Sequence, residues 1–360
     1  MERFVCETKI IGGDGVVDIL KELAARRVLV VTDPYFYDSG EAAAVAEKTG
    51  AAEVEIFREV APDPGIELAA AGTARIRAFA PDLIIALGGG SAMDCAKAMK
   101  YFSGTKAKLV AVPTTSGSGS EVTDFAILTH NGVKHPLVDA SLRPDLAILD
   151  DRFLQRLPKS LIADSGFDVL AHALEALGAT GAGAVTDALA RDAFCTVFGN
   201  LARSYRGDTG VRCAIHMAAT MAGMAFSQAG LGLCHALAHS LGGVFHVPHG
   251  RLNGILLPAV LDWNAKAVGH KYATLARAAG LGGSVDTIAV RNLRNGLVRL
   301  RRELELPETL AEAGVKPEQL RQRREEIIGA ALADPCCKTN PVTVDGETVK
   351  QVLDAVTGHG

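Results

Sequence analysis

The chain has 360 residues, of which 48% are hydrophobic and 22% are charged, and its formal net charge at pH 7 is −4. This length is enough for two domains, and the composition is typical of a globular protein with a sizeable core. The net charge and the lack of a dominant basic tract argue against nucleic acid as a partner. No apolar run approaches the ~20 residues that cross a bilayer, so we expect no membrane association. The N-terminus lacks the apolar segment of a secretory signal, which predicts a cytoplasmic protein with reduced thiols.

Residues 1–150 alternate short apolar runs with stretches of helical character. Continuous apolar runs are typical of strands that are buried on both faces of a parallel sheet. Strands are predicted at residues 27–32, 53–57, 82–87, 108–112 and 145–149, and helices at 16–25, 41–49 and 66–79. This alternation predicts an α/β domain with a doubly wound, Rossmann-like parallel sheet. Asn131-Gly132, between the runs 125–128 and 135–138, predicts a β-hairpin at the edge or exit of that sheet.

From about residue 157 the strand signal disappears, and the chain reads as all-helical. Helices are predicted at residues 159–177, 184–205, 210–228, 234–241, 252–265, 272–279, 287–305, 317–333 and 346–356. We expect the arginines at 291, 294, 299, 301 and 302 on the solvated face of one of them. The predicted division is an α/β domain over residues 1–156 and an all-helical domain over residues 157–360.

Two glycine-rich turns follow predicted strands, at residues 88–94 (GGGSAMD) and 113–123 (PTTSGSGSEVT). Glycines let a phosphate approach the backbone, and the helix N-terminus after the first turn offers free N–H groups. Either turn alone is also compatible with an ordinary strand-to-helix connection. Asp33 ends the first long strand, where a carboxylate can accept the hydroxyls of an adenosine ribose and repel a 2′-phosphate. That role favours NAD(H); the alternative is that Asp33 caps the turn before Pro34.

Residues 234–250 (CHALAHSLGGVFHVPHG) contain four of the ten histidines. His235 and His239 share one face of a predicted helix, as do Asp168 and His172 in an apolar segment upstream. The third imidazole of the set is His249 or His246, after a bend expected at the glycines 242 and 243. One carboxylate with two or three imidazoles suits Fe²⁺, Zn²⁺ or a similar divalent metal, and it is too rich in nitrogen for Mg²⁺ or Ca²⁺.

Four stretches together resemble the iron-containing alcohol dehydrogenase family. They are GGGSAMDCAK (88–97), PTTSGSGSEVT (113–123), GFDVLAHALEA (166–176) and CHALAHSLGGVFHVPHG (234–250). They occur in the family's order across nearly the whole chain. PDPGIE (62–67) and GMAFSQAGLGL (223–233) look closest to the 1-propanol dehydrogenase branch of propanediol-utilisation microcompartments.

The resemblance implies site residues position by position. The metal ligands correspond to Asp168, His172, His235 and His249, so His249 is preferred to His246. His239 corresponds to an unligated histidine beside the nicotinamide, either a catalytic proton relay or a structural neighbour of the site. The other cofactor contacts correspond to Asp33, Gly89, Gly90, Ser91, Asp94, Thr114, Thr115, Thr123, Phe125 and Lys134. The implied roles are NAD(H) binding for residues 1–156 and metal-dependent catalysis for residues 157–360.

The implied activity is hydride transfer between NAD(H) and a short-chain primary alcohol or its aldehyde, 1-propanol and propanal first, with Fe²⁺ or else Zn²⁺. Ethanol, lactaldehyde, butanol and glycerol-type polyol dehydrogenases are alternatives. A dehydroquinate synthase-like lyase and a non-catalytic microcompartment cargo protein are alternatives of another class. The resemblance also implies a homodimer or higher oligomer, with residence inside a bacterial microcompartment as one possible location in the cytoplasm.

Overall fold

The computed structural model describes residues 4–130 and 133–358. The described chain forms two compact units, one from Val5 to Leu157 and the other from Pro158 onward together with Phe4. Each unit has a core of its own, and each is described separately below.

The first unit is built on a six-stranded sheet of order β1-β8-β5-β4-β2-β3, in which all neighbouring strands run parallel. The strands are β1 (Lys9–Gly13), β2 (Arg27–Thr32), β3 (Glu53–Phe57), β4 (Leu83–Gly88), β5 (Lys108–Pro113) and β8 (Leu146–Asp150). The predicted doubly wound sheet is therefore confirmed. The strand β1 was not predicted, because it is a short edge strand that ends in two glycines and its residues are only partly buried.

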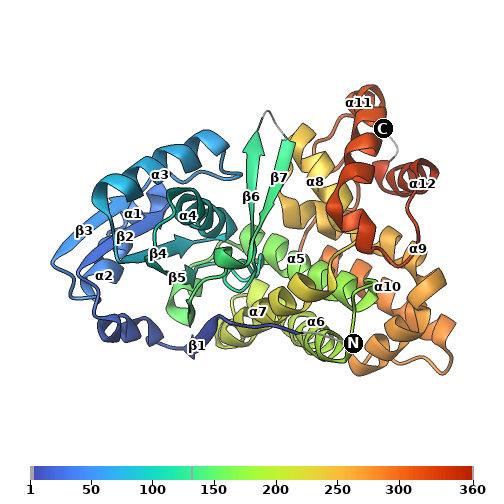
Figure 1. Cartoon of the computed structure of the whole chain (residues 1–360). Coiled ribbons are helices and arrows are strands. Elements are labelled where there is room, and N and C mark those ends of the chain that lie inside the picture. Colours follow the sequence, from blue (N-terminus) through green and yellow to red (C-terminus); the bar gives the residue numbers. More distant parts are fainter. Residues whose placement is uncertain (1–3, 131–132, 359–360) are drawn as a thin grey trace. The chain divides into compact units, whose positions relative to one another are not determined.

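Successive residues of the central strands enter different cores on the two faces of this sheet. Leu29 and Val31 pack in one core with residues of α3 (Ile66–Phe79) and α4 (Gly90–Ser103). Val28 and Val30 pack in another with residues of η1 (Val16–Leu23), α1 (Pro34–Asp38) and α2 (Glu41–Glu47). Figure 1 shows these elements around the sheet. The element η1 is a 3₁₀-helix in place of the α-helix predicted at 16–25.

The predicted hairpin is also present. The strands β6 (Phe125–His130) and β7 (Val133–Val138) pair antiparallel and form a sheet of their own (Figure 1). The predicted turn residues 131 and 132 lie outside the described residues. The short 3₁₀-helices η2 (Ala140–Leu142) and η3 (Asp151–Leu154) flank β8.

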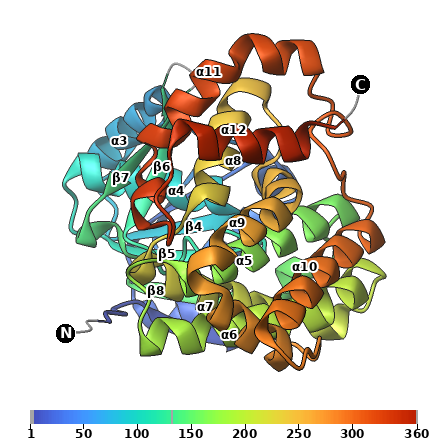
Figure 2. The same cartoon turned by 90° about the vertical axis from the view of Figure 1, so that its right-hand side faces the viewer.

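The second unit is helical, as predicted. Its α-helices are α5 (Lys159–Gly178), α6 (Ala184–Tyr205), α7 (Arg212–Ala229), α8 (Leu233–Phe245), α9 (His249–Ala278), α10 (Asp286–Glu303), α11 (Pro317–Ala333) and α12 (Gly346–Thr357). Two 3₁₀-helices, η4 (Thr209–Val211) and η5 (Pro335–Thr339), accompany them. Helix α5 packs against α6, α7 and α9 and is buried almost throughout from Ile162 to Gly178 (Figure 2). Among the described residues, no helix combines the length and apolar character that crossing a membrane requires.

Helix α8 and helix α9 differ from the prediction. The bend expected at Gly242 and Gly243 is absent, since α8 continues to Phe245 and the left-handed residue that ends it is His246, with φ 56°. A glycine inside a helix costs roughly 0.5–1 kcal/mol, and burial of the apolar residues of α8 offsets that cost. The helices predicted at 252–265 and 272–279 are one element, α9, interrupted only at the non-helical residue Val268.

One of the five arginines that were expected to face solvent is buried. Arg301 is buried, and its guanidinium donates hydrogen bonds to the carbonyl oxygens of Gly254 (3.3 Å) and Ile255 (3.5 Å) in α9. The prediction of a fully solvated arginine face was therefore wrong at this position.

Candidate metal centre and nucleotide-binding loops

Asp33 and the first glycine-rich turn meet where the order of the sheet reverses. The strand β2 pairs with β3 on one side and with β4 on the other, and ligands of such sheets bind at the carboxyl ends beside this switch point. Asp33 follows β2 directly, and Gly88 ends β4. A Cβ at Gly88 would lie 3.5 Å from Oδ2 of Asp33 and only 2.7 Å from Cβ of Ala92. Glycine is required here, both for this space and for the backbone φ of 150°.

The second glycine-rich turn packs against the first. The N–H of Thr114 donates to the carbonyl of Gly88 (2.9 Å), and a Cβ at Gly89 would lie 3.3 Å from Oγ1 of Thr115. Helix α4 begins at Gly90, after the N-cap residue Gly89, which brings no side chain to its first N–H groups. A helix start of this kind beside a polar turn is suited to a phosphate.

A buried lysine that was not predicted holds the second turn in place. Lys97 of α4 is 0% exposed, and its Nζ donates to Oγ of Ser120 (3.0 Å), to O and Oγ1 of Thr123 (3.0 and 2.9 Å) and to O of Phe125 (2.9 Å). Burial lowers the pKa of Lys97 to about 8 against the opposing attraction of nearby carboxylates. Thr123 and Phe125, two predicted cofactor contacts, therefore also accept hydrogen bonds that hold this loop against α4.

Two further predicted cofactor contacts also have partners within the unit. Asp94 accepts hydrogen bonds from Oγ of Ser120 (2.7 Å) and from the N–H of Ile127 (3.1 Å). Nζ of Lys134 lies 2.8 Å from Oδ1 of Asp63, a residue with the unusual φ of 52°. The carboxylate of Asp94 and the ammonium group of Lys134 thus connect segments around the predicted nucleotide site. All the predicted cofactor contacts except His239 belong to this first unit.

The predicted metal ligands belong to the second unit and come from three helices. Asp168 and His172 lie one turn apart on α5, and His235 lies on α8. His249 is the first residue of α9, and the next residue explains how it reaches the others. A Cβ at Gly250 would lie 2.0 Å from the carbonyl oxygen of Asp164, so only glycine lets the start of α9 approach α5 this closely.

The three imidazoles converge on one oxygen atom of Asp168. Oδ1 of Asp168 lies 3.4 Å from Nε2 of His249, 3.7 Å from Nε2 of His235 and 3.9 Å from Nε2 of His172. The rings of His172 and His235 are stacked with their centroids 4.5 Å apart. His246, the competing candidate, is exposed at the end of α8. The geometry therefore favours His249 as the third imidazole.

The donor set fits a divalent transition metal. Donor atoms bound to one ion at about 2.0–2.2 Å lie roughly 3–3.5 Å from one another. The Nε2 atoms of the three imidazoles lie 3.4–3.9 Å from Oδ1 of Asp168, and Asp168, His172 and His235 offer ligand atoms that all lie within 4.8 Å of one another. Nδ2 of Asn253 donates to Oδ1 of Asp168 (2.8 Å) and lies 3.3 and 3.2 Å from Nε2 of His235 and His249. One carboxylate oxygen and two imidazole nitrogens thus lie around one point between the three helices. Mixed nitrogen and oxygen ligands suit iron or zinc.

Charge in this buried cluster shifts the pKa of its members. Burial alone would raise the pKa of Asp168, but the three surrounding imidazoles hold it well below its usual range. Burial alone would lower the pKa of His235, whereas hydrogen bonds to Asp168 and Glu175 raise it to about 9. Both shifts have one cause, the attraction between carboxylate and imidazole in a site of low polarity.

His239 lies beside the cluster but has a partner of its own. Its Nδ1 is 2.8 Å from Oδ2 of Asp334, the residue that precedes η5, and its ring stacks on His249 with centroids 5.1 Å apart. Burial would raise the pKa of Asp334, but the contact with His239 brings it down to about 2. The carboxylate of Asp334 therefore orients the ring of His239 through Nδ1. Nε2 is the ring nitrogen that does not take part in this contact.

Several neighbours of these ligands were missed in the sequence. Glu175, Asn253 and Asp334 contact His235, Asp168 and His239 respectively. Helical spacing from a predicted ligand could have indicated two of these three residues. Glu175 lies seven residues after Asp168, on the same face of α5, and Asn253 lies one helical turn after His249. Asp334 is distant in sequence and only the tertiary structure brings it to His239.

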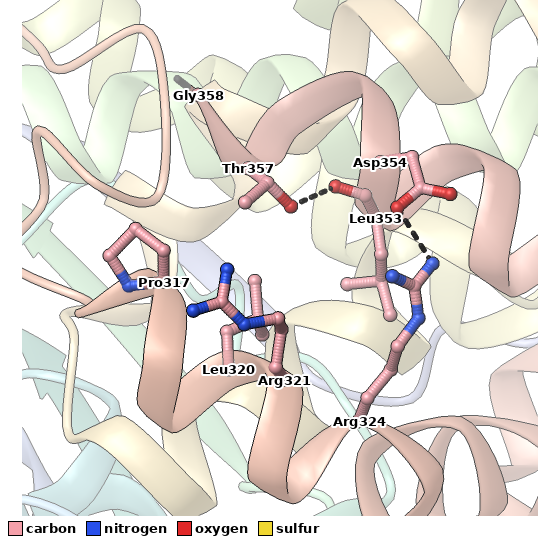
Figure 3. A pocket seen from close by; sticks show the side chains of 8 residues that line it. All are labelled: Pro317, Leu320, Arg321, Arg324, Leu353, Asp354, Thr357 and Gly358. Carbon is pink, nitrogen blue, oxygen red and sulfur yellow. Dashed lines mark hydrogen bonds and ion pairs between the residues drawn. The ribbon is translucent and has the colours of Figure 1, made fainter. Parts of the chain in front are cut away.

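A pocket of about 520 Å³ lies elsewhere in the second unit, beside α11 and α12 (Figure 3). It is lined by Pro317, Leu320, Arg321, Arg324, Leu353, Asp354, Thr357 and Gly358. Arg324 pairs across it with Asp354 at 2.8 Å. This lining includes none of the predicted site residues, so the pocket is separate from the metal cluster.

Two family models match the chain, "Iron-containing alcohol dehydrogenase" over residues 7–151 and "Fe-containing alcohol dehydrogenase family, C-terminal" over residues 162–357. The chain is 39% identical to 1-propanol dehydrogenase PduQ of Citrobacter freundii, over 98% of this chain and 99% of the relative. It is 35% identical to an NADPH-dependent butanol dehydrogenase of Clostridium saccharobutylicum, over 99% and 98%. An iron-containing alcohol dehydrogenase structure from Thermococcus thioreducens matches with a TM-score of 0.91 at 33% identity, covering 99% of this chain and 100% of that one. The chain therefore belongs to the iron-containing alcohol dehydrogenase family and is an oxidoreductase of the alcohol dehydrogenase type.

Proposed function

We propose that this enzyme interconverts a short-chain primary alcohol and its aldehyde, 1-propanol and propanal first, with NAD(H) as the redox cofactor. The ion is Fe²⁺, with Zn²⁺ as the alternative, and its ligands are Asp168, His172, His235 and His249. The convergence of three Nε2 atoms on Oδ1 of Asp168 carries this proposal. Similarity to the PduQ enzymes, at 37–39% identity, supports 1-propanol as the first substrate to test.

We assign different roles at the reacting centre to different residues of the second unit. When bound, the ion supplies a Lewis acid for the substrate oxygen. Asp168 and the imidazoles hold it, and the ring of Phe226, stacked on His172 at 4.3 Å, gives the cluster an apolar neighbour. Asp334 orients the ring of His239 through Nδ1, and we assign Nε2 of His239 to receive and return the substrate proton.

The first unit is proposed to hold the cofactor, which supplies the hydride when bound. Gly89, Gly90 and Ser91 at the start of α4, with Thr114 and Thr115 opposite, would take the phosphates. Asp33 would take the adenosine ribose and exclude a 2′-phosphate. We assign Asp94, Thr123, Phe125 and Lys134 to the same site, both as contacts and as the groups that keep its loops in place.

The test is NADH oxidation by propanal, followed by near-ultraviolet absorbance with anaerobic, iron-reconstituted protein. We expect steady turnover in wild type, and we expect His235→Ala to lose both bound metal and turnover, because one of the proposed ligands is removed. The exposed His246→Ala variant is the matched control and should keep both metal and turnover.

Two outcomes would contradict the proposal. No NADH oxidation with any short aldehyde by metal-loaded protein would favour the lyase or cargo alternative. Unchanged metal content and turnover in His235→Ala would remove His235 from the ligand set. A substrate panel of ethanal, lactaldehyde, butanal and dihydroxyacetone separates the remaining dehydrogenase alternatives. The homodimer or higher oligomer and the cytoplasmic or microcompartment location remain predictions.

A further inference from the structure

We propose that Glu175 is the positioning residue of the metal centre, holding His235 in the one tautomer that can bind a cation. This inference rests on the proposed function, because it concerns the same ion site. It extends that proposal to a residue outside the ligand set.

The carboxylate of Glu175 is buried and is surrounded by N–H groups. It is 3% exposed, and it lies on α5 one turn beyond His172. Its Oε2 accepts from the backbone N–H of Gly232 (2.9 Å) and of His235 (3.3 Å), and its Oε1 from the N–H of Cys234 (2.7 Å). These are the first N–H groups of α8, which its own N-cap, Gly232, has no side chain to satisfy. Glu175 therefore anchors the helix that carries His235 to the helix that carries Asp168.

The same carboxylate also contacts the imidazole of His235. Nδ1 of His235 lies 2.7 Å from Oε2 of Glu175. That oxygen already accepts two backbone N–H groups, so it is an acceptor here and the ring nitrogen is the donor. With its proton fixed on Nδ1, the neutral ring has its lone pair on Nε2. This is the atom that lies 3.7 Å from Oδ1 of Asp168, in the cluster of donors.

Fixing the tautomer has a direct consequence for metal affinity. A histidine that donates its second N–H to a carboxylate is held in orientation and is a more basic ligand, and loss of such a partner typically costs 10–100-fold in metal affinity. Glu175 also adds a second buried carboxylate near Asp168, and a divalent ion would balance the two charges. We infer that Glu175 sets both the geometry and the charge of this site.

The experiment compares the metal affinity of Glu175→Gln with that of wild type and of Asn340→Ala. Each chelator-stripped protein is titrated with Zn²⁺ and with Co²⁺ in competition with a chromophoric chelator. We expect Glu175→Gln to bind both ions 10–100-fold more weakly, because its amide can offer N–H to Nδ1 and so favour the wrong tautomer of His235. The Co²⁺ absorption bands should shift as the ligand field changes.

Asn340→Ala is the matched control, since it alters the same helix start without touching the ring of His235. Oδ1 of Asn340 accepts from the N–H of Leu233 at 3.1 Å and from Asn264 at 2.9 Å. We expect this variant to lose thermal stability, because a capping group of α8 is removed, but to keep the metal affinity of wild type. Equal losses of metal affinity in both variants would overturn the proposal, since capping α8 would then be the whole role of Glu175.

A measurement on wild-type protein keeps the proposal testable if Glu175→Gln does not fold. In the Zn²⁺-loaded chain, imidazole ¹H–¹⁵N spectra should show His235 with its proton on Nδ1, and a proton on Nε2 would overturn the proposal. If Glu175→Gln binds Zn²⁺ and Co²⁺ as tightly as wild type does, the proposal is overturned as well. Failure of wild type to bind either ion would instead refute the proposed metal function.

Discussion

At the scale of single residues, the structure shows Asp33 in one of the two roles that the sequence left as alternatives, the cap of a turn, and its role in cofactor binding stays a proposal. One carboxylate oxygen, Oδ1, accepts the N–H of Phe36 at 3.2 Å and so caps α1. The other, Oδ2, faces Gly88 at the end of β4. Because the capping N–H is accepted by Oδ1, Oδ2 lies toward the end of β4, where we propose that the cofactor binds.

The charge of Asp33 should therefore be separable from its capping role. Asparagine keeps an oxygen for the N–H of Phe36 but removes the negative charge. We expect Asp33→Asn to leave the thermal midpoint nearly unchanged. It should raise the ratio of kcat/KM for NADPH to that for NADH by about tenfold or more, since like charges in contact cost several kcal/mol and about 1.4 kcal/mol is tenfold.

The control is Asp38→Asn, which removes a charge from the exposed end of the same helix. Its cofactor ratio should match that of wild type. An unchanged ratio in Asp33→Asn would show that cofactor choice is made elsewhere in the chain, and equal changes in both variants would point to net charge alone.

At the scale of elements, the long helix α9 depends on a side chain from α10. Pro258 lies inside α9 and has no N–H, so the carbonyl of Gly254, four residues earlier, loses its helical partner. Nη1 of Arg301 takes that place at 3.3 Å. This explains why an arginine in a run of otherwise solvated ones is buried. Amphipathic spacing alone gave no sign of it, because the carbonyl that it satisfies belongs to another helix.

Arg301→Met should reveal this dependence. Methionine keeps much of the apolar stem but leaves the carbonyl of Gly254 without its donor, and an unsatisfied buried polar group costs about 1–3 kcal/mol. We expect the free energy of unfolding to fall by that amount in chemical denaturation. Arg299→Met, two residues earlier on the exposed face, should change it by no more than about 0.5 kcal/mol. Equal effects of the two substitutions would mean that helix propensity or net charge, and not the carbonyl of Gly254, is responsible.

At the scale of the whole molecule, periodic apolar patterns in the sequence predicted most of the strands and helices. They predicted few of the side-chain contacts between helices. Continuous apolar runs located five of the six sheet strands, and β1 was not predicted because it is a short, partly exposed edge strand that ends in two glycines. Helical spacing placed Asp168 and His172 on one face, whereas choosing His249 over His246 needed the family resemblance. Glu175, Asn253 and Lys97 are isolated polar residues in apolar helices. Helical spacing could place Glu175 and Asn253 on the faces of their helices that carry ligands, but the contacts of Glu175 with α8 and of Lys97 with the second glycine-rich turn depend on the tertiary structure.

The two units should respond to different ligands, and hydrogen–deuterium exchange over the whole chain can map both responses. The proposed ion ligands lie on α5, α8 and the first turn of α9, and the proposed nucleotide loops lie after β2, β4 and β5. A ligand that binds only the folded state stabilises it by mass action, so backbone N–H groups near it should exchange more slowly. We expect Zn²⁺ to slow exchange in α5 and α8, and NADH to slow it in residues 88–94 and 113–125. His235→Ala should lose the first effect and keep the second. Slower exchange around residues 88–94 on adding Zn²⁺, with none in α5 or α8, would contradict the assignment of the ion to the helical unit.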